Sequence, residues 1–216
     1  MSDDGLLMDQ ASARLTEALR SGAIRSGQFL SLSMLVEALG LPLAAVREAV
    51  KRAESLGFVT VLPKRGVQVM EADAATTRAC MDLRAVLDTE GARRLLATGL
   101  PDLAPLRTSH RTLIARATRG EPGLAPVAID VDLGLHGFLA SGLAGNPLLR
   151  DAYEANRIRV AIIQNTRAFL PDRIVPAMEE HLAIMDALES GVFDRVAAAI
   201  RTHYRQTLRW WGIDEG

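Results

Sequence analysis

Four residues in the C-terminal part of the chain have the chemical types and the spacing of a metal site. Asp132 and His136 stand four residues apart on a predicted helix. That spacing is an angular offset of about 40°, so it places a carboxylate and an imidazole on one helical face. His181 and His203 lie on two further predicted helices. Three imidazoles and one carboxylate from three helices can converge inside a helical bundle, where such groups bind divalent metal ions.

Spacing by itself leaves this interpretation open. An Asp-x3-His pair arises often by chance, and a single helical histidine is more often a surface residue or a hydrogen-bonded core residue than a metal ligand. His110 has no acidic or histidine companion at helical spacing, and we expect it at the surface.

Long amphipathic helices must carry these side chains. Glycine and proline clusters divide the sequence after residue 75 into helical stretches of about twenty residues, as is typical of an antiparallel bundle. We predict six or seven helices in a domain over 75–212. The six expected spans are 75–98, 102–119, 124–143, 147–168, 171–189 and 192–211.

Residues 10–71 have a different pattern, with short helical stretches followed by β-rich ones. A helix is predicted over 11–21, a second begins after Ser31 or Ser33, and a third follows the short turn Gly40-Leu41-Pro42. Two β-rich stretches, 58–62 and 67–70, enclose the turn 63–66 and form a hairpin. Three helices closed by a hairpin are the plan of a winged helix-turn-helix domain, so the predicted fold class is mostly α with a small β-hairpin wing.

Charge is distributed unevenly along the chain. The 216 residues contain 25 basic and 26 acidic side chains, which excludes a diffuse binder of polyanions. Residues 10–70, however, hold eight basic and four acidic side chains. Five of the eight lie on the third helix and the hairpin turn, the two elements that a winged helix presents to DNA. They are Arg47, Lys51, Arg52, Lys64 and Arg65.

These basic residues predict two kinds of DNA contact. Arg47, one turn into the third helix, can form two hydrogen bonds to guanine in the major groove. Lys64 and Arg65 are suited to backbone phosphates, and Gly66 lets the turn approach a groove closely. The alternative is that the charges only solvate the surface of a small domain.

Cysteine content and the first residues indicate the cellular compartment. Cys80 is the only cysteine, so an intrachain disulfide is impossible and a reducing environment fits. The first residues are acidic where a secretory signal is basic, and no apolar run approaches the ~20 residues of a membrane span. We expect a cytoplasmic protein without a membrane partner.

The N-terminal segments resemble, in order and spacing, the GntR family of bacterial transcription regulators. Residues 35–41 (LVEALGL) resemble its "LAExLGV", 46–50 (VREAV) its "VREAL" and 65–69 (RGVQV) its "RGAxV". The resemblance implies binding to double-stranded operator DNA through Arg47, Lys51, Arg52, Lys64, Arg65 and Gly66. Two arginines that the family usually carries are replaced, at the positions of Ser33 and Leu43.

The C-terminal segments resemble the FadR-type ligand-binding domain. Residues 132–136 (DLGLH) resemble its "DxxFH", 145–149 (GNPLL) its "SGNPLL" and 180–188 (EHLAIMDAL) its "EHxxILxAI". The resemblance implies that Asp132, His136, His181 and His203 are metal ligands. Such a ligand set suits Zn²⁺, Ni²⁺, Co²⁺ or Mn²⁺.

A metal centre of this kind leaves positions for water or for the carboxylate of an effector. Arg84 is the candidate second anchor, since a guanidinium can form two hydrogen bonds to a carboxylate. An interhelical or surface salt bridge is the alternative role for Arg84.

Two functions compete at this point. The first is a homodimeric transcription regulator whose operator binding responds to a small organic acid. The second is a metal-dependent enzyme, for example a hydrolase. A hydrolase needs an acid or base beside the metal, and Glu180 points about 100° away from His181 along its helix. The enzyme hypothesis would also leave the basic helix and wing unexplained, so we predict a regulator with no catalytic residues.

Overall fold

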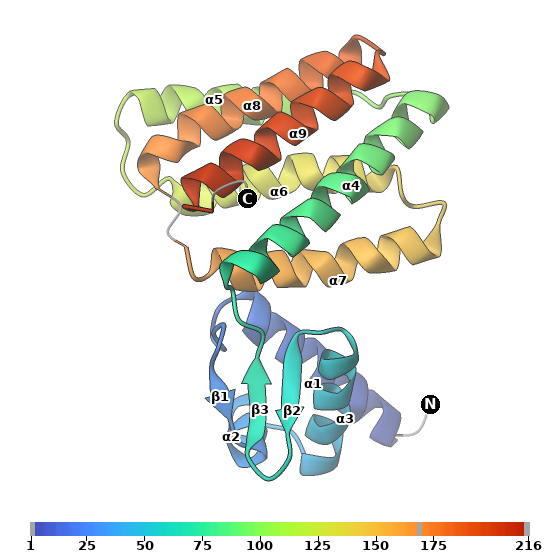
Figure 1. The fold of residues 1–216 in the computed structure, drawn as a ribbon, viewed down its shortest axis with the longest axis vertical. Helices are drawn as coiled ribbons and strands as arrows, with labels where there is room; N and C mark the ends of the chain where they lie inside the picture. The colour runs from blue at the N-terminus through green and yellow to red at the C-terminus, as the bar shows by residue number, and fades with distance from the viewer. Residues whose placement is uncertain (1–2, 168–169, 214–216) are drawn as a thin grey trace. The chain divides into compact units, whose positions relative to one another are not determined.

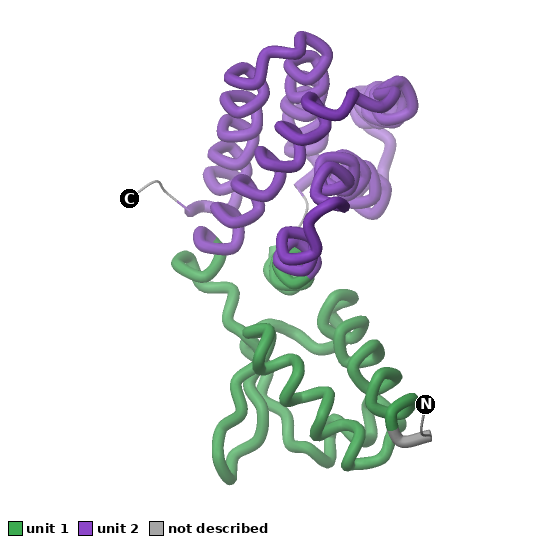
Figure 2. Tube along the Cα trace, turned by 90° about the vertical axis from the view of Figure 1, so that its right-hand side faces the viewer, with its two compact units in different colours: residues 1–77, 155–167 green, residues 78–154, 168–216 purple. Residues whose placement is uncertain are grey.

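The computed structural model describes residues 3–167 and 170–213. It divides the chain into two compact units (Figure 2). The first comprises the residues up to Thr77 together with 155–167, and the second comprises 78–154 with the residues from 168 onward. No helix among the described residues is both long enough and apolar enough to cross a membrane.

Three helices form the frame of the first unit (Figure 1). They are α1 (Asp3–Arg20), α2 (Leu32–Leu39) and α3 (Leu43–Ser55). The Ser31 hydroxyl accepts a hydrogen bond from the Met34 amide and caps α2, and Gly40 ends α2 in the left-handed conformation. Only residues 40–42 separate α2 from α3, which confirms the predicted helix-turn-helix.

The wing is a three-stranded antiparallel sheet within the described residues. Its strands are β1 (Phe29–Leu30), β2 (Val59–Leu62) and β3 (Gly66–Val69), in the order β1-β3-β2. Val59 is paired with Val69 and Leu62 with Gly66, as a hairpin requires. The sequence pattern predicted β2 and β3 but not β1, because two residues are too few to show an alternating pattern.

The C-terminal part of α7 (Pro147–Gln164) belongs to the first unit. Ile158 and Ile162 join the core of that unit. The Asn165 side chain donates to the carbonyls of Leu19 and Arg20 at the end of α1, and Arg159 donates to the Leu56 carbonyl just beyond α3. Carbonyls at the C-terminal end of a helix lack the amide donors of a following turn, so residues 155–167 help to cap α1 and α3 of the winged helix-turn-helix.

Helices dominate the second unit, and their described bounds lie within four residues of the predicted spans. The helices are α4 (Ala74–Thr98), α5 (Ala104–Thr118), α6 (Ala125–Ser141), the first part of α7, α8 (Pro171–Glu189) and α9 (Phe193–Trp210). Helix α8 packs against both α5 and α9, and α6 packs against α5 and α8. The predicted fold class, mostly α with a winged helix-turn-helix and a helical bundle, is confirmed.

Two glycines bring α4 and the end of α6 into backbone contact. A Cβ at Gly91 would lie 2.1 Å from the Leu139 carbonyl oxygen, and a Cβ at Gly142 would lie 2.2 Å from the Gly91 carbonyl oxygen. No side chain fits at either point without moving one of the backbones. This close approach places Asp88, one turn before Gly91, beside the face of α6 that carries His136.

We predict that Gly91→Ala lowers the free energy of unfolding by about 1–3 kcal/mol, because the added methyl group overlaps the α6 backbone. Gly137→Ala in α6 is the matched control: a Cβ there meets no atom within 4 Å, so alanine should stabilise the helix by about 0.5–1 kcal/mol. Urea denaturation of both variants measures the difference. Equal changes in the free energy of unfolding for the two substitutions would contradict the backbone contact between α4 and α6.

Candidate metal centre and nucleic-acid surface

Four side chains converge inside the second unit. Asp132 and His136 come from α6, His181 from α8 and His203 from α9. One ligand atom from each lies within 4.8 Å of the others, and all four residues are buried. The structure therefore brings together the four residues that the sequence analysis selected.

His136 is oriented by a carboxylate from α4. Its Nδ1 lies 2.6 Å from Asp88 Oδ2, which also accepts a hydrogen bond of 2.5 Å from the Tyr204 hydroxyl. A carboxylate can only accept here, so Nδ1 of His136 carries the hydrogen and Nε2 carries the lone pair. Nε2 has no hydrogen-bond partner among the described residues and lies 3.6 Å from Asp132 Oδ1.

His203 is oriented in the same way by a second carboxylate. Its Nδ1 lies 2.8 Å from Glu180 Oε2. Glu180 is in turn held by Arg173, whose two terminal nitrogens donate to the two carboxylate oxygens at 2.5 and 2.6 Å. The hydrogen on Nδ1 again leaves the lone pair on Nε2, the nitrogen that faces the cluster.

His181 has a neutral partner instead of a carboxylate. Its Nδ1 lies 3.0 Å from Nε2 of His110, and Nδ1 of His110 lies 2.7 Å from the Leu106 carbonyl oxygen. His110 is fully buried, so the expectation that it lies at the surface was wrong. The missed signal was its place in a stripe with Leu106 and Leu113, at i−4 and i+3, which indicates the inward face of α5.

This arrangement fits a divalent cation. Nε2 of His181 lies 3.4 Å from Nε2 of His203 and 3.5 Å from Asp132 Oδ1. When both histidines carry their hydrogen on Nδ1, two lone pairs and a carboxylate oxygen face one another in a buried space. Only a proton or a metal ion at that point removes the repulsion. Histidines that donate their other N–H to a fixed acceptor are the usual ligands of protein-bound metals.

Burial and local charge set the protonation of the cluster. Burial, together with the neighbouring His203, holds the pKa of His181 well below its usual value, so His181 is neutral. Burial and Arg84 act to lower the pKa of His136, but the carboxylates of Asp88 and Asp132 outweigh them and raise it. His136 is thus the imidazole at which a proton competes most strongly with a metal ion.

Arg84 lies beside this cluster. Its Nη2 is 3.5 Å from Asp132 Oδ2, and the arginine side chain is 8% exposed. The structure thus contains the interhelical salt bridge that was one of the two roles considered for Arg84. Glu180, the only acid next to a candidate ligand in sequence, accepts from Arg173 and His203.

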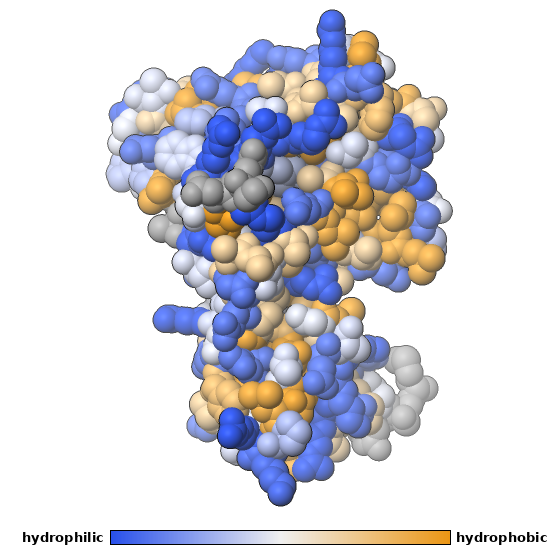
Figure 3. All heavy atoms as spheres, viewed as in Figure 1, coloured by the Kyte–Doolittle hydropathy of each residue, from blue (hydrophilic) through white to orange (hydrophobic). Residues whose placement is uncertain are grey.

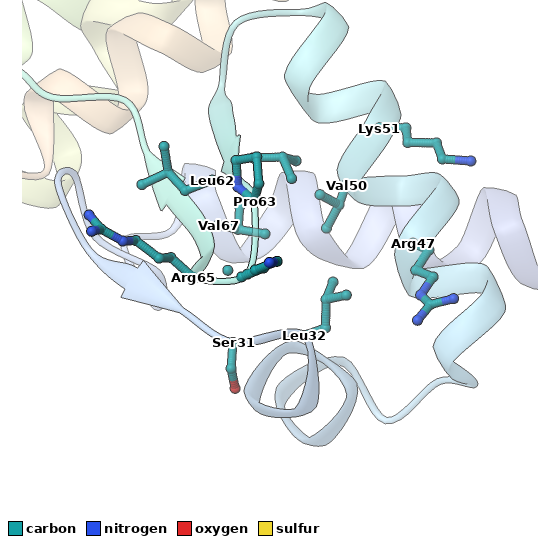
Figure 4. Close-up of a pocket in the computed structure, with 12 residues that line it drawn as sticks. Ser31, Leu32, Arg47, Val50, Lys51, Leu62, Pro63, Arg65 and Val67 are labelled. Carbon is teal, nitrogen blue, oxygen red and sulfur yellow. The ribbon is translucent and has the colours of Figure 1, made fainter.

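A second feature lies in the winged helix-turn-helix. A hollow of about 440 Å³ between α3 and the wing is lined by Arg47, Lys51, Lys64 and Arg65 around apolar side chains such as Val50 (Figure 4). Arg47, Lys64 and Arg65 form no ion pair with any described residue. Three positive charges are therefore uncompensated on one surface.

The other predicted DNA-contacting residues have different surroundings. Lys51 pairs with Glu48 at 2.7 Å, and Arg52 pairs with Asp9 of α1 at 3.2 Å. Arg52 lines a separate hollow that also contains Asp9. Gly66 has a structural requirement, since a Cβ there would lie 2.4 Å from the Leu30 carbonyl oxygen of β1.

Two family models match these two units. Residues 79–206 match the FCD domain, and residues 7–69 match the bacterial regulatory proteins of the gntR family. The chain belongs to the GntR family. This GntR protein is a transcription regulator with a DNA-binding domain and an FCD effector-binding domain.

Solved structures share its fold. McbR/YncC of E. coli is 20% identical, with a TM-score of 0.69 and 97% of each chain covered. A GntR transcriptional regulator from Rhodococcus sp. RHA1 is 20% identical, with a TM-score of 0.72, and the match covers 96% of this chain and 99% of that one. A search of curated proteins found no match.

We predict that Zn²⁺ binds this GntR regulator more weakly at about pH 6 than at about pH 8, because the raised pKa of His136 makes a proton compete for Nε2. Zinc binding should release protons. Calorimetric titration in two buffers of different ionisation enthalpy measures both effects. Affinity that is independent of pH across this range, without proton release, would rule out His136 as a ligand.

Proposed function

We propose that this GntR regulator binds a pseudo-palindromic operator in the cytoplasm as a homodimer, and that a small organic acid at a divalent metal ion in the FCD domain modulates this binding. The observation that carries the proposal is the set of three oriented imidazoles and one carboxylate, buried at one point of an effector-binding domain.

The surface between α3 and the wing supports the DNA-binding part of the proposal. Arg47 lies on the exposed face of α3, where a major-groove helix presents its side chains to base edges. Lys64 and Arg65 lie at the tip of the wing and are free to bind phosphates. Lys51, Arg52 and Gly66 complete the proposed contact set. Lys51 and Arg52 must first give up their ion pairs, so we expect smaller contributions from them.

The backbone at Lys64 supports a functional role for its side chain. Lys64 has φ of +63°, the only positive value among the described residues other than glycine. It follows Pro63 in a turn closed by a 2.9 Å hydrogen bond from the Arg65 amide to the Leu62 carbonyl, where glycine is favoured. The left-handed conformation costs a non-glycine residue about 1–2 kcal/mol. A lysine at this position is unfavourable for folding, and DNA binding would explain its presence.

The donor set supports the metal and its ligands. Asp132, His136, His181 and His203 would hold Zn²⁺, Ni²⁺, Co²⁺ or Mn²⁺. A bound metal would supply positive charge to which a carboxylate can attach. The Arg84 guanidinium, buried beside Asp132, would be a second anchor for the same carboxylate, since it has five N–H donors in a planar fork.

Exposed apolar side chains support a homodimer formed through the second unit. Val86 of α4 is 64% exposed and Leu148 at the start of α7 is 80% exposed. Figure 3 shows apolar residues gathered on the face of this unit. Exposed apolar patches of this kind mark protein–protein contacts, and a second copy of the chain would present two winged helices to two half-sites.

We predict that Lys64→Gly raises the free energy of unfolding by about 1 kcal/mol, because glycine adopts the left-handed conformation without strain. The same variant should bind DNA more weakly, with a salt dependence reduced by about 0.9 in log–log slope. Arg47→Ala should instead cost about 1–3 kcal/mol of preference for the operator over random DNA. Fluorescence anisotropy with both DNAs at several salt concentrations measures these effects.

Arg20→Ala is the matched control, since it removes an exposed positive charge of the same unit that is paired with Glu17. It should change neither the salt dependence nor the preference for the operator. If Arg20→Ala weakened DNA binding as much as Lys64→Gly does, the effect of Lys64 would be one of overall charge and not of a specific contact. Absence of DNA binding at low salt by the unsubstituted protein would refute the DNA-binding surface altogether.

A further inference from the structure

His110 is a buried histidine outside the set of four candidate ligands. It lies on α5, has no exposed surface, and is hydrogen-bonded to the cluster through His181, with 3.0 Å between its Nε2 and Nδ1 of His181. Its other ring nitrogen lies 2.7 Å from the Leu106 carbonyl oxygen, one turn earlier on the same helix. Three groups on two helices thus form one hydrogen-bonded chain that ends at the candidate metal centre.

The direction of this chain is fixed at its outer end. A carbonyl oxygen only accepts hydrogen bonds, so Nδ1 of His110 carries a hydrogen and donates it to Leu106. An imidazole ring that carries its hydrogen on Nδ1 has its lone pair on Nε2, the nitrogen that lies 3.0 Å from Nδ1 of His181. Nε2 of His110 must then accept, and the donor is Nδ1–H of His181. The hydrogen on Nδ1 leaves the lone pair of His181 on Nε2, which faces His203 Nε2 and Asp132 Oδ1.

The opposite set of tautomers is disfavoured at the outer end of the chain. A hydrogen on Nε2 of His110 would leave the lone pair of Nδ1 against the Leu106 oxygen at 2.7 Å, with no hydrogen between them. It would also put the hydrogen of His181 on Nε2, where it blocks a ligand position. The Ser109 hydroxyl does not change this, because it already donates to the Leu106 carbonyl and lies 3.4 Å from Nδ1 of His110.

We propose that His110 is a positioning residue of the metal centre: it transmits the polarity of the Leu106 carbonyl to His181 and thereby holds the His181 lone pair toward the metal. His136 and His203 receive the same orientation from the carboxylates of Asp88 and Glu180. His181 alone depends on a neutral ring. The effect on metal affinity rests on the proposed function of the cluster, whereas the effect on the His181 tautomer does not.

Two variants at this position separate orientation from packing. His110→Leu fills much of the space but removes both hydrogen bonds, so His181 loses the acceptor that fixes its tautomer. His110→Gln retains an amide oxygen that accepts from His181. Removal of an orienting partner typically weakens metal binding 10–100-fold, so we expect a zinc dissociation constant about 10–100 times higher for His110→Leu. For His110→Gln we expect a change several-fold smaller.

The experiment has two readouts on the full chain. The first is the ring ¹⁵N spectrum of the metal-free protein at about pH 8, which reports the neutral tautomer of each histidine. We expect His181 with its hydrogen on Nδ1 in the unsubstituted protein and in His110→Gln, and a mixture of both tautomers in His110→Leu. The second is the zinc dissociation constant, measured by competition with a chelator. Ile114→Ala, which loosens the packing of the same helix but removes none of these hydrogen bonds, is the control.

Several results would overturn the proposal. One is a His181 hydrogen on Nε2 in the unsubstituted protein. Another is an unchanged His181 tautomer and zinc affinity in His110→Leu. A third is an affinity loss in Ile114→Ala as large as that in His110→Leu, which would indicate loosened packing rather than lost orientation. Failure of the unsubstituted protein to bind zinc would refute the metal centre, while the tautomer spectrum would still decide the role of His110.

Discussion

Three imidazole rings and one carboxylate are buried at a single point of the helical unit, and each ring has its far nitrogen tied to an acceptor. Burying polar groups without partners is costly, so a cluster of this kind persists only when its surroundings fix every hydrogen. Asp88, Glu180 and the Leu106 carbonyl, acting through His110, supply that constraint from α4, α8 and α5. The orientation of the candidate ligands therefore depends on residues spread over most of the bundle.

Packing makes those acceptors available. Asp88 reaches His136 because α4 and α6 touch at Gly91, where a methyl group would overlap a carbonyl oxygen. Arg173 fixes Glu180, and Glu180 fixes His203, so one ion pair on α8 determines the orientation of a ring on α9. In the first unit, Asn165 and Arg159 similarly tie residues 155–167 to the ends of α1 and α3. In both units polar side chains at a few points fix the relation between elements that apolar packing alone would leave loose.

The sequence predicted what is local. The helix spans follow from glycine and proline positions. The Asp132–His136 pair can be recognised in the sequence because both residues lie on one helix, about one turn apart. The orienting residues were not predictable in the same way, since Asp88 is 48 residues from His136 and His110 is 71 from His181. No periodicity within one helix reveals such partners. The same limit applies to Ile158 and Ile162, whose apolar pattern predicts a buried face but does not identify the unit that covers it.

The most direct measurement is the X-ray absorption spectrum of the zinc-loaded protein at the zinc edge. We predict three imidazole nitrogens at about 2.0–2.1 Å and at least one oxygen at about 2.0–2.2 Å, with the multiple-scattering pattern of three rings. His181→Ala should reduce the pattern to two rings. A first shell with one imidazole or none, or with a sulfur at about 2.3 Å, would contradict the convergence of His136, His181 and His203 on one metal ion.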